Sequence, residues 1–177
     1  MTGRPLPHAR RFRHGTAAGS LSIEIVDRQR RLRVSASWLE AVARAALTAE
    51  RVRDAEICIV VVNDRRIGRL HDEWFDDPSP TDVITFNLSD GGDPVLRGDI
   101  AVSAETAMRM ARQPGLSRPG WTPRHELAYY VVHGILHLTG YDDRTPADRR
   151  AMRARERTVM REAGLPAPPR SVGRLRS

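Results

Sequence analysis

Residues 122–143 read TPRHELAYYVVHGILHLTGYDD, and the rest of the fold is organised around this stretch. Thr122 is a good N-terminal cap for a helix, and Pro123 suits the first helical turn. The apolar run that follows predicts one long helix to about Thr139, and Gly140 ends it. We therefore expect this helix to lie at the centre of the domain.

The same stretch carries the residues of a metal site. His133 and His137 are four residues apart, so on a helix both imidazoles leave the same face and reach one ion. The break at Gly140 lets the chain fold back and bring Asp143 to that ion. Two imidazoles and one carboxylate leave a fourth position for water, which is typical of catalytic zinc. We expect one Zn²⁺ per chain, although iron, nickel or cobalt would also suit these ligands.

Alternating strands and helices are predicted before and after the central helix. Strands are expected at 21–26, 56–62, 82–88 and 98–103. Helices are expected from a capping box of Ser37 and Glu40, from Asn63 to the prolines Pro78 and Pro80, from Ser103 over 104–112, and from Thr145 and Pro146 through Ala163. This order predicts an α/β (α+β) fold: a small mixed four-stranded sheet with helices packed on it, and the metal site at the end of the long central helix.

Length and charge predict one domain with two tails. The chain has 177 residues and a net charge of +7, but residues 1–20 and 164–177 hold only arginine among their Asp, Glu, Lys and Arg residues. We expect disordered tails there and a neutral domain over 21–163, so that any RNA-binding face is local. Cys58 lies in the apolar run EICIVVV and is expected in the core. No apolar run approaches the roughly 20 residues that span a bilayer, so we expect a soluble, cytoplasmic protein without a membrane partner.

Three motifs resemble the YbeY family of bacterial endoribonucleases. HGILHLTGYDD at 133–143 is similar to the family's H-G-x-L-H-L-x-G-Y-D-H, PTDVITF at 80–86 to its P-T-[DN]-V-L-S-F, and GDIAVS at 98–103 to its G-D-I-x-I-S. The resemblance covers roughly residues 21–163. It implies a metal-dependent, single-strand-specific endoribonuclease that matures the 3′ end of small-subunit ribosomal RNA and acts in ribosome quality control. Its partners would be RNA and the ribosome or its small subunit, and its metal ligands His133, His137 and residue 143.

Two positions depart from the family pattern. Asp143 stands where the motif has a third histidine, but a carboxylate is also an ordinary zinc ligand. Phe75 stands where the family usually has an arginine thought to hold the scissile phosphate. We expect the last helix to supply the missing charge, with Arg144, Arg149 or Arg150 nearest to the metal loop. Catalysis would then rest on the three ligands, acting through bound water, and on Arg144.

Other interpretations of the histidines have to be weighed. A metalloprotease with this spacing needs Glu directly after the first His as general base, and this chain has Gly134 there. A ribosome-associated RNA-binding factor with a mainly structural metal stays open, because the family arginine is missing. Of the remaining histidines, His125 is expected to support the site, whereas the others should be exposed to solvent: His8, His14 and His71.

Overall fold

A mixed four-stranded sheet forms the centre of the protein, as predicted. The computed structural model describes residues 19–169 except 78, 80, 91 and 115–117. Most of the predicted tails, 1–18 and 170–177, therefore lie outside the described residues. The strands are β1 (Leu21–Asp27), β2 (Ala55–Val62), β3 (Val83–Asn87) and β4 (Leu96–Ser103), in the order β1-β2-β4-β3. β1, β2 and β4 run parallel, and β3 runs antiparallel to β4.

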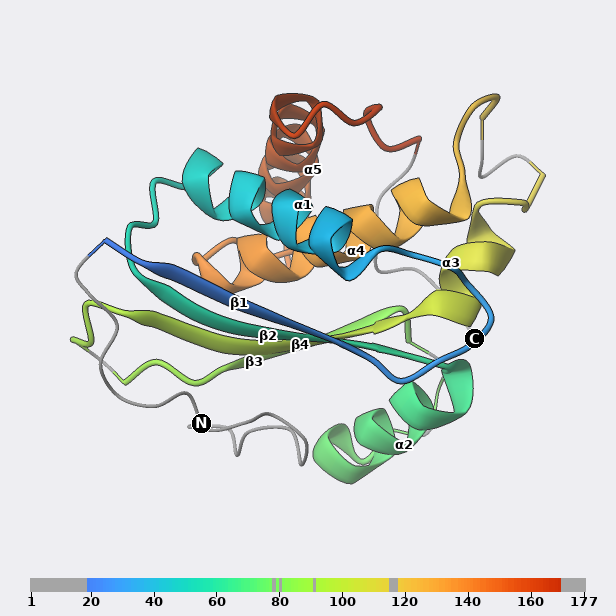
Figure 1. Cartoon of the computed structure of the whole chain (residues 1–177), viewed down its shortest axis with the longest axis horizontal. Helices are drawn as coiled ribbons and strands as arrows, with labels where there is room; N and C mark the ends of the chain where they lie inside the picture. Colours follow the sequence, from blue (N-terminus) through green and yellow to red (C-terminus); the bar gives the residue numbers. More distant parts are fainter. Residues whose placement is uncertain (1–18, 78, 80, 91, 115–117, 170–177) are drawn as a thin grey trace.

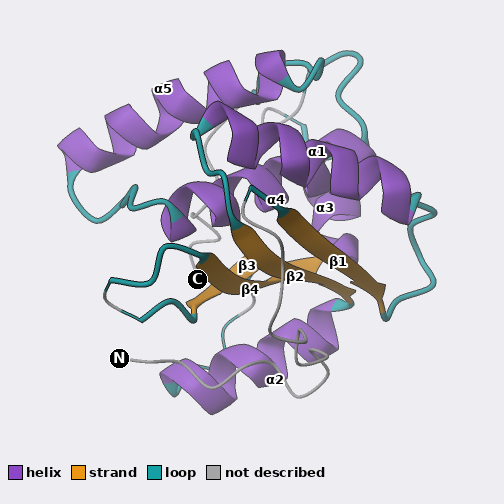
Figure 2. Cartoon of the chain, turned by 60° about the vertical axis from the view of Figure 1, so that its left-hand side comes forward, coloured by secondary structure: helices purple, strands orange, loops and turns teal. Residues whose placement is uncertain are grey.

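Five helices among the described residues pack around this sheet. They are α1 (Ala36–Ala49), α2 (Asp64–Phe75), α3 (Ala104–Met110), α4 (Pro123–Leu138) and α5 (Pro146–Glu162). Figures 1 and 2 show α1, α4 and α5 on one face of the sheet and α2 on the opposite face. No helix within the described part of the chain is long and apolar enough to cross a membrane.

Most of the helices begin at the predicted caps. Side-chain oxygens of Asn63, Ser103, Thr122 and Thr145 accept bonds from backbone N–H groups in the first turn. The prediction that Ser37 caps α1 is wrong, because Ser35 takes the extended cap conformation and accepts from the Trp38 N–H. The predicted end of α2 is also too late. α2 stops at Phe75, where Asp76 adopts the left-handed conformation with φ of 53° before either proline is reached.

α4 is buried on nearly all sides, so the packing around it fixes the positions of its histidines. Every residue from 126 to 136 is buried, between the sheet on one side and α1 and α5 on the other. The helix lies close against the sheet at Gly134. A Cβ on Gly134 would lie 2.8 Å from Ile100 Cγ2 and 3.1 Å from Thr85 Oγ1. His133 is the neighbour of this contact, so the helix–sheet packing fixes the position of the imidazole.

We expect Gly134→Ala to lower the free energy of unfolding by about 1–3 kcal/mol, because the added methyl overpacks a β-branched side chain of the sheet. Thermal and urea denaturation measure the loss. Gly68→Ala is the matched control: Gly68 is also helical, and a Cβ added there would have no heavy atom of another segment within 4 Å. That substitution should stabilise by about 0.5–1 kcal/mol through helix propensity. Equal stability of the two variants would contradict the close approach.

Candidate metal centre

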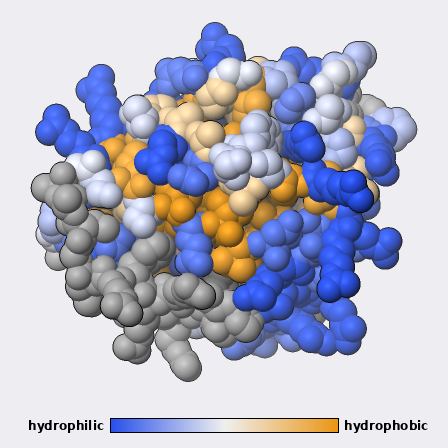
Figure 3. All heavy atoms as spheres, viewed as in Figure 1, coloured by the Kyte–Doolittle hydropathy of each residue, from blue (hydrophilic) through white to orange (hydrophobic). Residues whose placement is uncertain are grey.

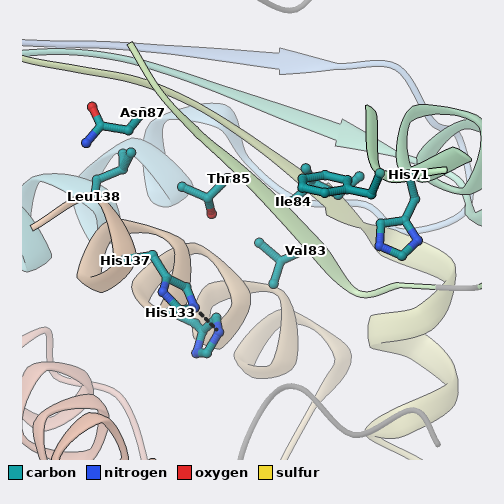
Figure 4. A pocket seen from close by; sticks show the side chains of 9 residues that line it. His71, Val83, Ile84, Thr85, Asn87, His133, His137 and Leu138 are labelled. Carbon is teal, nitrogen blue, oxygen red and sulfur yellow. Dashed lines mark hydrogen bonds between the residues drawn. The ribbon is translucent and has the colours of Figure 1, made fainter. Parts of the chain in front are cut away.

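His133 and His137 face each other at the C-terminal end of α4. Their Nε2 atoms are 2.9 Å apart, and their ring centroids are separated by 4.5 Å with the rings nearly perpendicular. Figure 4 shows the two imidazoles side by side on the helix. Ligand atoms of His133, His137 and Asp143 all lie within 4.8 Å of one another. The structure thus brings together the three predicted ligands.

Acceptors from other segments hold the far nitrogen of each imidazole. His133 Nδ1 lies 2.7 Å from Glu156 Oε1 of α5, and the other oxygen of that carboxylate accepts from the Tyr129 hydroxyl at 2.8 Å. His137 Nδ1 lies 3.0 Å from the Tyr141 carbonyl oxygen. A carboxylate and a carbonyl only accept, so Nδ1 carries the proton in both rings. Each Nε2 then offers its lone pair, as in histidines that bind metal.

The loop that carries Asp143 is built by the chain reversal after α4. Gly140 has φ of 101°, a conformation that glycine adopts without strain. Tyr141 N–H then donates to the Leu136 carbonyl at 3.0 Å, which turns the chain back along the helix. Arg149 fixes the end of the loop by donating to the carbonyls of Asp143 at 2.9 Å and Arg144 at 2.8 Å. The predicted fold-back of residue 143 toward the histidines is confirmed.

The electrostatics of the site suit a cation. Burial lowers the pKa of His137, and the neighbouring His133 lowers it further, while Asp143 acts in the opposite direction. The lowered pKa favours the neutral form of the His137 ring, which is the form that binds metal. Two lone pairs 2.9 Å apart repel each other unless a cation lies between them. Tetrahedral zinc with Zn–N bonds of 2.0–2.1 Å separates two nitrogens by about 3.4 Å, so small movements of the side chains are enough.

An open pocket of about 310 Å³ lies beside the two histidines. It is lined by His133, His137 and Leu138 of α4, by His71 and Phe75 of α2, and by Val83, Ile84, Thr85 and Asn87 of β3. Because the two histidines open onto this pocket, a substrate can approach them from solvent. The lining therefore indicates a catalytic rather than a closed structural site.

Two predictions about the other histidines are wrong. The His71 side chain is only 19% exposed and faces the pocket, with Nδ1 3.1 Å from the Ser79 carbonyl oxygen. His125 does not support the metal ligands, because it lies in the first turn of α4. There its Nδ1 accepts from the Thr122 N–H at 3.3 Å as part of a capping box. His8 and His14 lie outside the described residues.

The positions linked to the missing arginine are also placed by the structure. Phe75 lines the pocket and is 54% exposed, with one face stacked on Phe86. Arg144 is 87% exposed, pairs with Asp142 at 3.3 Å and does not line the pocket. Arg149 is bound to the loop backbone. The role of Arg144 in catalysis stays a prediction.

Glu156 is the residue that the sequence alone did not single out. It is 2% exposed and lies among apolar residues on the buried face of α5: Met152, Val159 and Met160. An acid in the middle of an apolar helix face is unusual, and this pattern is the one signal in the sequence that points to it. Its partner lies 23 residues earlier, so only the packing of α5 on α4 reveals the contact.

Known proteins match this chain over most of its length. The family model described as Endoribonuclease YbeY matches residues 22–164. A protein of Anaeromyxobacter dehalogenans with that name is 45% identical over 132 residues, which are 74% of this chain but slightly under two thirds (66%) of that protein. One of Chloroflexus aggregans is 42% identical over 146 residues, 76% of this chain and 92% of that protein. A solution structure of a protein from Thermotoga maritima is 24% identical in sequence and shows the same fold, with a TM-score of 0.56. The match covers 80% of this chain and 88% of the Thermotoga chain.

We expect the native protein to purify with about one divalent ion per chain, and His133→Ala or His137→Ala to remove most of it, because each takes away one of three protein ligands. Glu156→Ala should weaken metal affinity by about 10–100-fold, because it removes the acceptor that orients His133. Elemental analysis and competition with a chelating dye measure both effects. His125→Ala, on the same helix but in its first turn, is the control and should keep its metal.

The same measurements distinguish Asp143 from Asp142 as the third ligand. Asp143→Ala should lose more metal than Asp142→Ala. The Asp142 carboxylate is already bound to other groups, because it accepts from the Asp143 N–H at 2.7 Å and pairs with Arg144. Asp143→His should keep the metal. Unchanged metal content in both histidine variants, or equal losses at 142 and 143, would show that the ligands are assigned wrongly.

Proposed function

This chain belongs to the YbeY family of endoribonucleases, and we propose that it hydrolyses single-stranded RNA at a Zn²⁺ ion held by His133, His137 and Asp143. Its substrate in the cell would be ribosomal RNA, in particular the 3′ end of the small-subunit RNA, and its partner the ribosome or its small subunit. A protein with this task works in the cytoplasm. The domain that does so is expected to span residues 21–163, with the tails outside it.

One observation carries the proposal: two imidazoles point their Nε2 atoms at one place, 2.9 Å apart, beside an open pocket. A histidine pair in a structural role would be closed off by protein atoms. When bound, the ion supplies a Lewis acid that lowers the pKa of water and neutralises charge on the phosphate. The donor set fits zinc, which accepts nitrogen and oxygen ligands at nearly equal distances.

The protein's own residues prepare the site for this chemistry. Glu156 and the Tyr141 carbonyl keep a proton on Nδ1 of His133 and His137, so neither ring has to reorient when it binds the ion. The buried helix α4 and the Arg149 contacts to the loop hold the ligands in place. β3 forms the facing wall with Thr85 and Asn87, whose polar side chains suit the phosphate and sugar of a strand. Preorganisation of this kind lowers the barrier because little has to move during reaction.

Phe75 favours a second candidate function. Phosphodiester cleavage places negative charge on phosphate oxygens, and a phenyl ring in the pocket cannot neutralise it. A chain that has lost this charge would bind RNA on the ribosome through the same pocket and cleave it slowly or not at all. The metal would then be mainly structural.

Cleavage of a labelled single-stranded RNA tests the proposal directly. We expect cutting by the native protein that is lost with a chelator and restored by Zn²⁺, with duplex RNA of the same sequence left intact. His137→Ala should lower the rate by at least about a hundredfold, because it removes a ligand of the catalytic ion. His125→Ala should cut normally. RNA binding without any metal-dependent cleavage would contradict the proposed nuclease activity and favour the RNA-binding factor.

We expect Phe75→Arg to raise the cleavage rate, since a guanidinium in the pocket can neutralise the negative charge on the phosphate oxygens in the transition state. Arg144→Ala should lower the rate if its side chain turns from Asp142 to the substrate. Single-turnover kinetics of the two variants measure both changes. A rate unaffected by Phe75→Arg would show that this position does not reach the scissile phosphate.

A further inference from the structure

The carboxyl ends of β1 and β2 form a crevice on the edge of the sheet. The two strands are neighbours and run parallel. After β1 the chain continues to α1 on one face of the sheet, and after β2 it continues to α2 on the opposite face (Figure 2). Helices that diverge from adjacent parallel strands leave a space at the strand ends, and open α/β sheets bind ligands there. The metal pocket does not include this edge.

Arginines dominate the cavity at this position. Its volume is about 430 Å³, and it is lined by Arg28 after β1 and by Asn63, Arg65, Arg66, Arg69, Leu70 and Glu73 after β2. Four arginines and a single acidic residue thus line it. Figure 3 shows hydrophilic side chains gathered over the corner where Figure 1 places α2. A cavity of this size has room for a phosphate and part of the nucleotide that carries it.

The four arginines have no acidic partner in the part of the chain that the structure describes, where none of them forms an ion pair. The next cavity along the same edge is lined by Arg31, Asp64, Glu105, Met108, Arg109 and Arg112, and there both carboxylates pair with an arginine. Arg31 contacts Glu105 at 3.5 Å, and Arg109 contacts Asp64 at 2.7 Å. Pairing is therefore available at this edge, and only one of the two cavities lacks it.

The helix end adds to the positive field. Arg65 and Arg66 lie in the first turn of α2, where backbone N–H groups give a partial positive charge. Asp64 does not cancel it, because its carboxylate accepts from Thr106 at 2.7 Å and Arg109 at 2.7 Å, beside the other cavity. Guanidinium groups bind phosphate through paired N–H donors. An anion with several oxygens is the ligand that satisfies such a cavity.

We propose that this cavity binds a phosphate of the RNA strand at a distance from the cut. The inference rests on the proposed function for its ligand. α2 connects the two sites, because His71 and Phe75 line the metal pocket and Arg65 and Arg69 line the cavity. Arg69 and Phe75 are separated by about 9 Å along the helix axis, at 1.5 Å per residue. A strand that crosses α2 therefore occupies both sites within a few nucleotides.

The test is the affinity for a short single-stranded 2′-O-methyl oligonucleotide, which reports binding without depending on cleavage. Arg65→Gln/Arg69→Gln should weaken binding by at least about fivefold, since two charge-assisted contacts are lost. The slope of log affinity against log salt should fall by about 0.7 for each phosphate contact removed. Arg28→Gln, on the opposite wall of the cavity, should act in the same direction. Fluorescence anisotropy at several salt concentrations measures these values, and melting curves check the fold.

Arg153→Gln/Arg157→Gln is the matched control, because it removes two exposed charges at the same helical spacing on α5. It should change the affinity by less than about twofold, because exposed charges far from the bound strand are largely screened by salt. Oligonucleotides with and without a 5′-phosphate show whether the cavity binds a terminal or an internal phosphate. A loss of affinity in the cavity variant with either oligonucleotide supports the site. Equal affinity of the cavity variant and the control would overturn the inference. If the native protein cuts RNA in that case, the proposed function survives, and if nothing is cut, the binding result still decides the cavity.

Discussion

The hydrogen bonds to the outer nitrogens of His133 and His137 are the constraint on which the site depends. Glu156 and the Tyr141 carbonyl hold Nδ1 of the two rings, so both Nε2 atoms converge. The partners come from different segments, one from the last helix and one from the loop after Gly140. Each segment has to pack correctly before the imidazoles can meet. The geometry of the site therefore depends on how α5 and the loop pack on α4.

Burial explains why this arrangement is held so firmly. A carboxylate as buried as Glu156 is tolerated only when its oxygens are bonded, and here His133 and Tyr129 satisfy one oxygen each. Removing one partner leaves an uncompensated polar group inside the protein, which costs more than the net value of the bond. The glycine contact between α4 and the sheet acts on the same helix from its other side. The histidines are thus fixed between a sheet and a buried acid.

Much of this could be predicted from the sequence, because it depends on local chemistry. Asn63, Thr122 and Thr145 cap their helices through bonds to residues three positions away, and the His133–His137 spacing acts within one turn. The failures have a different origin. Ser35 and Ser37 are both acceptable caps, and only the backbone conformation selects Ser35. Glu156 and His71 acquire their places through contacts between distant elements, which no periodicity in the sequence records.

The two sites proposed on either flank of α2 would form one RNA path, in which the metal pocket cuts the strand and the arginine cavity holds it. The metal centre is the part on which the rest depends. Anomalous diffraction at the zinc edge from crystals of the native protein tests it most directly. We predict one peak bonded to the Nε2 atoms of His133 and His137 and to the Asp143 carboxylate. A peak bonded to other residues, or no peak between the two imidazoles, would contradict the account.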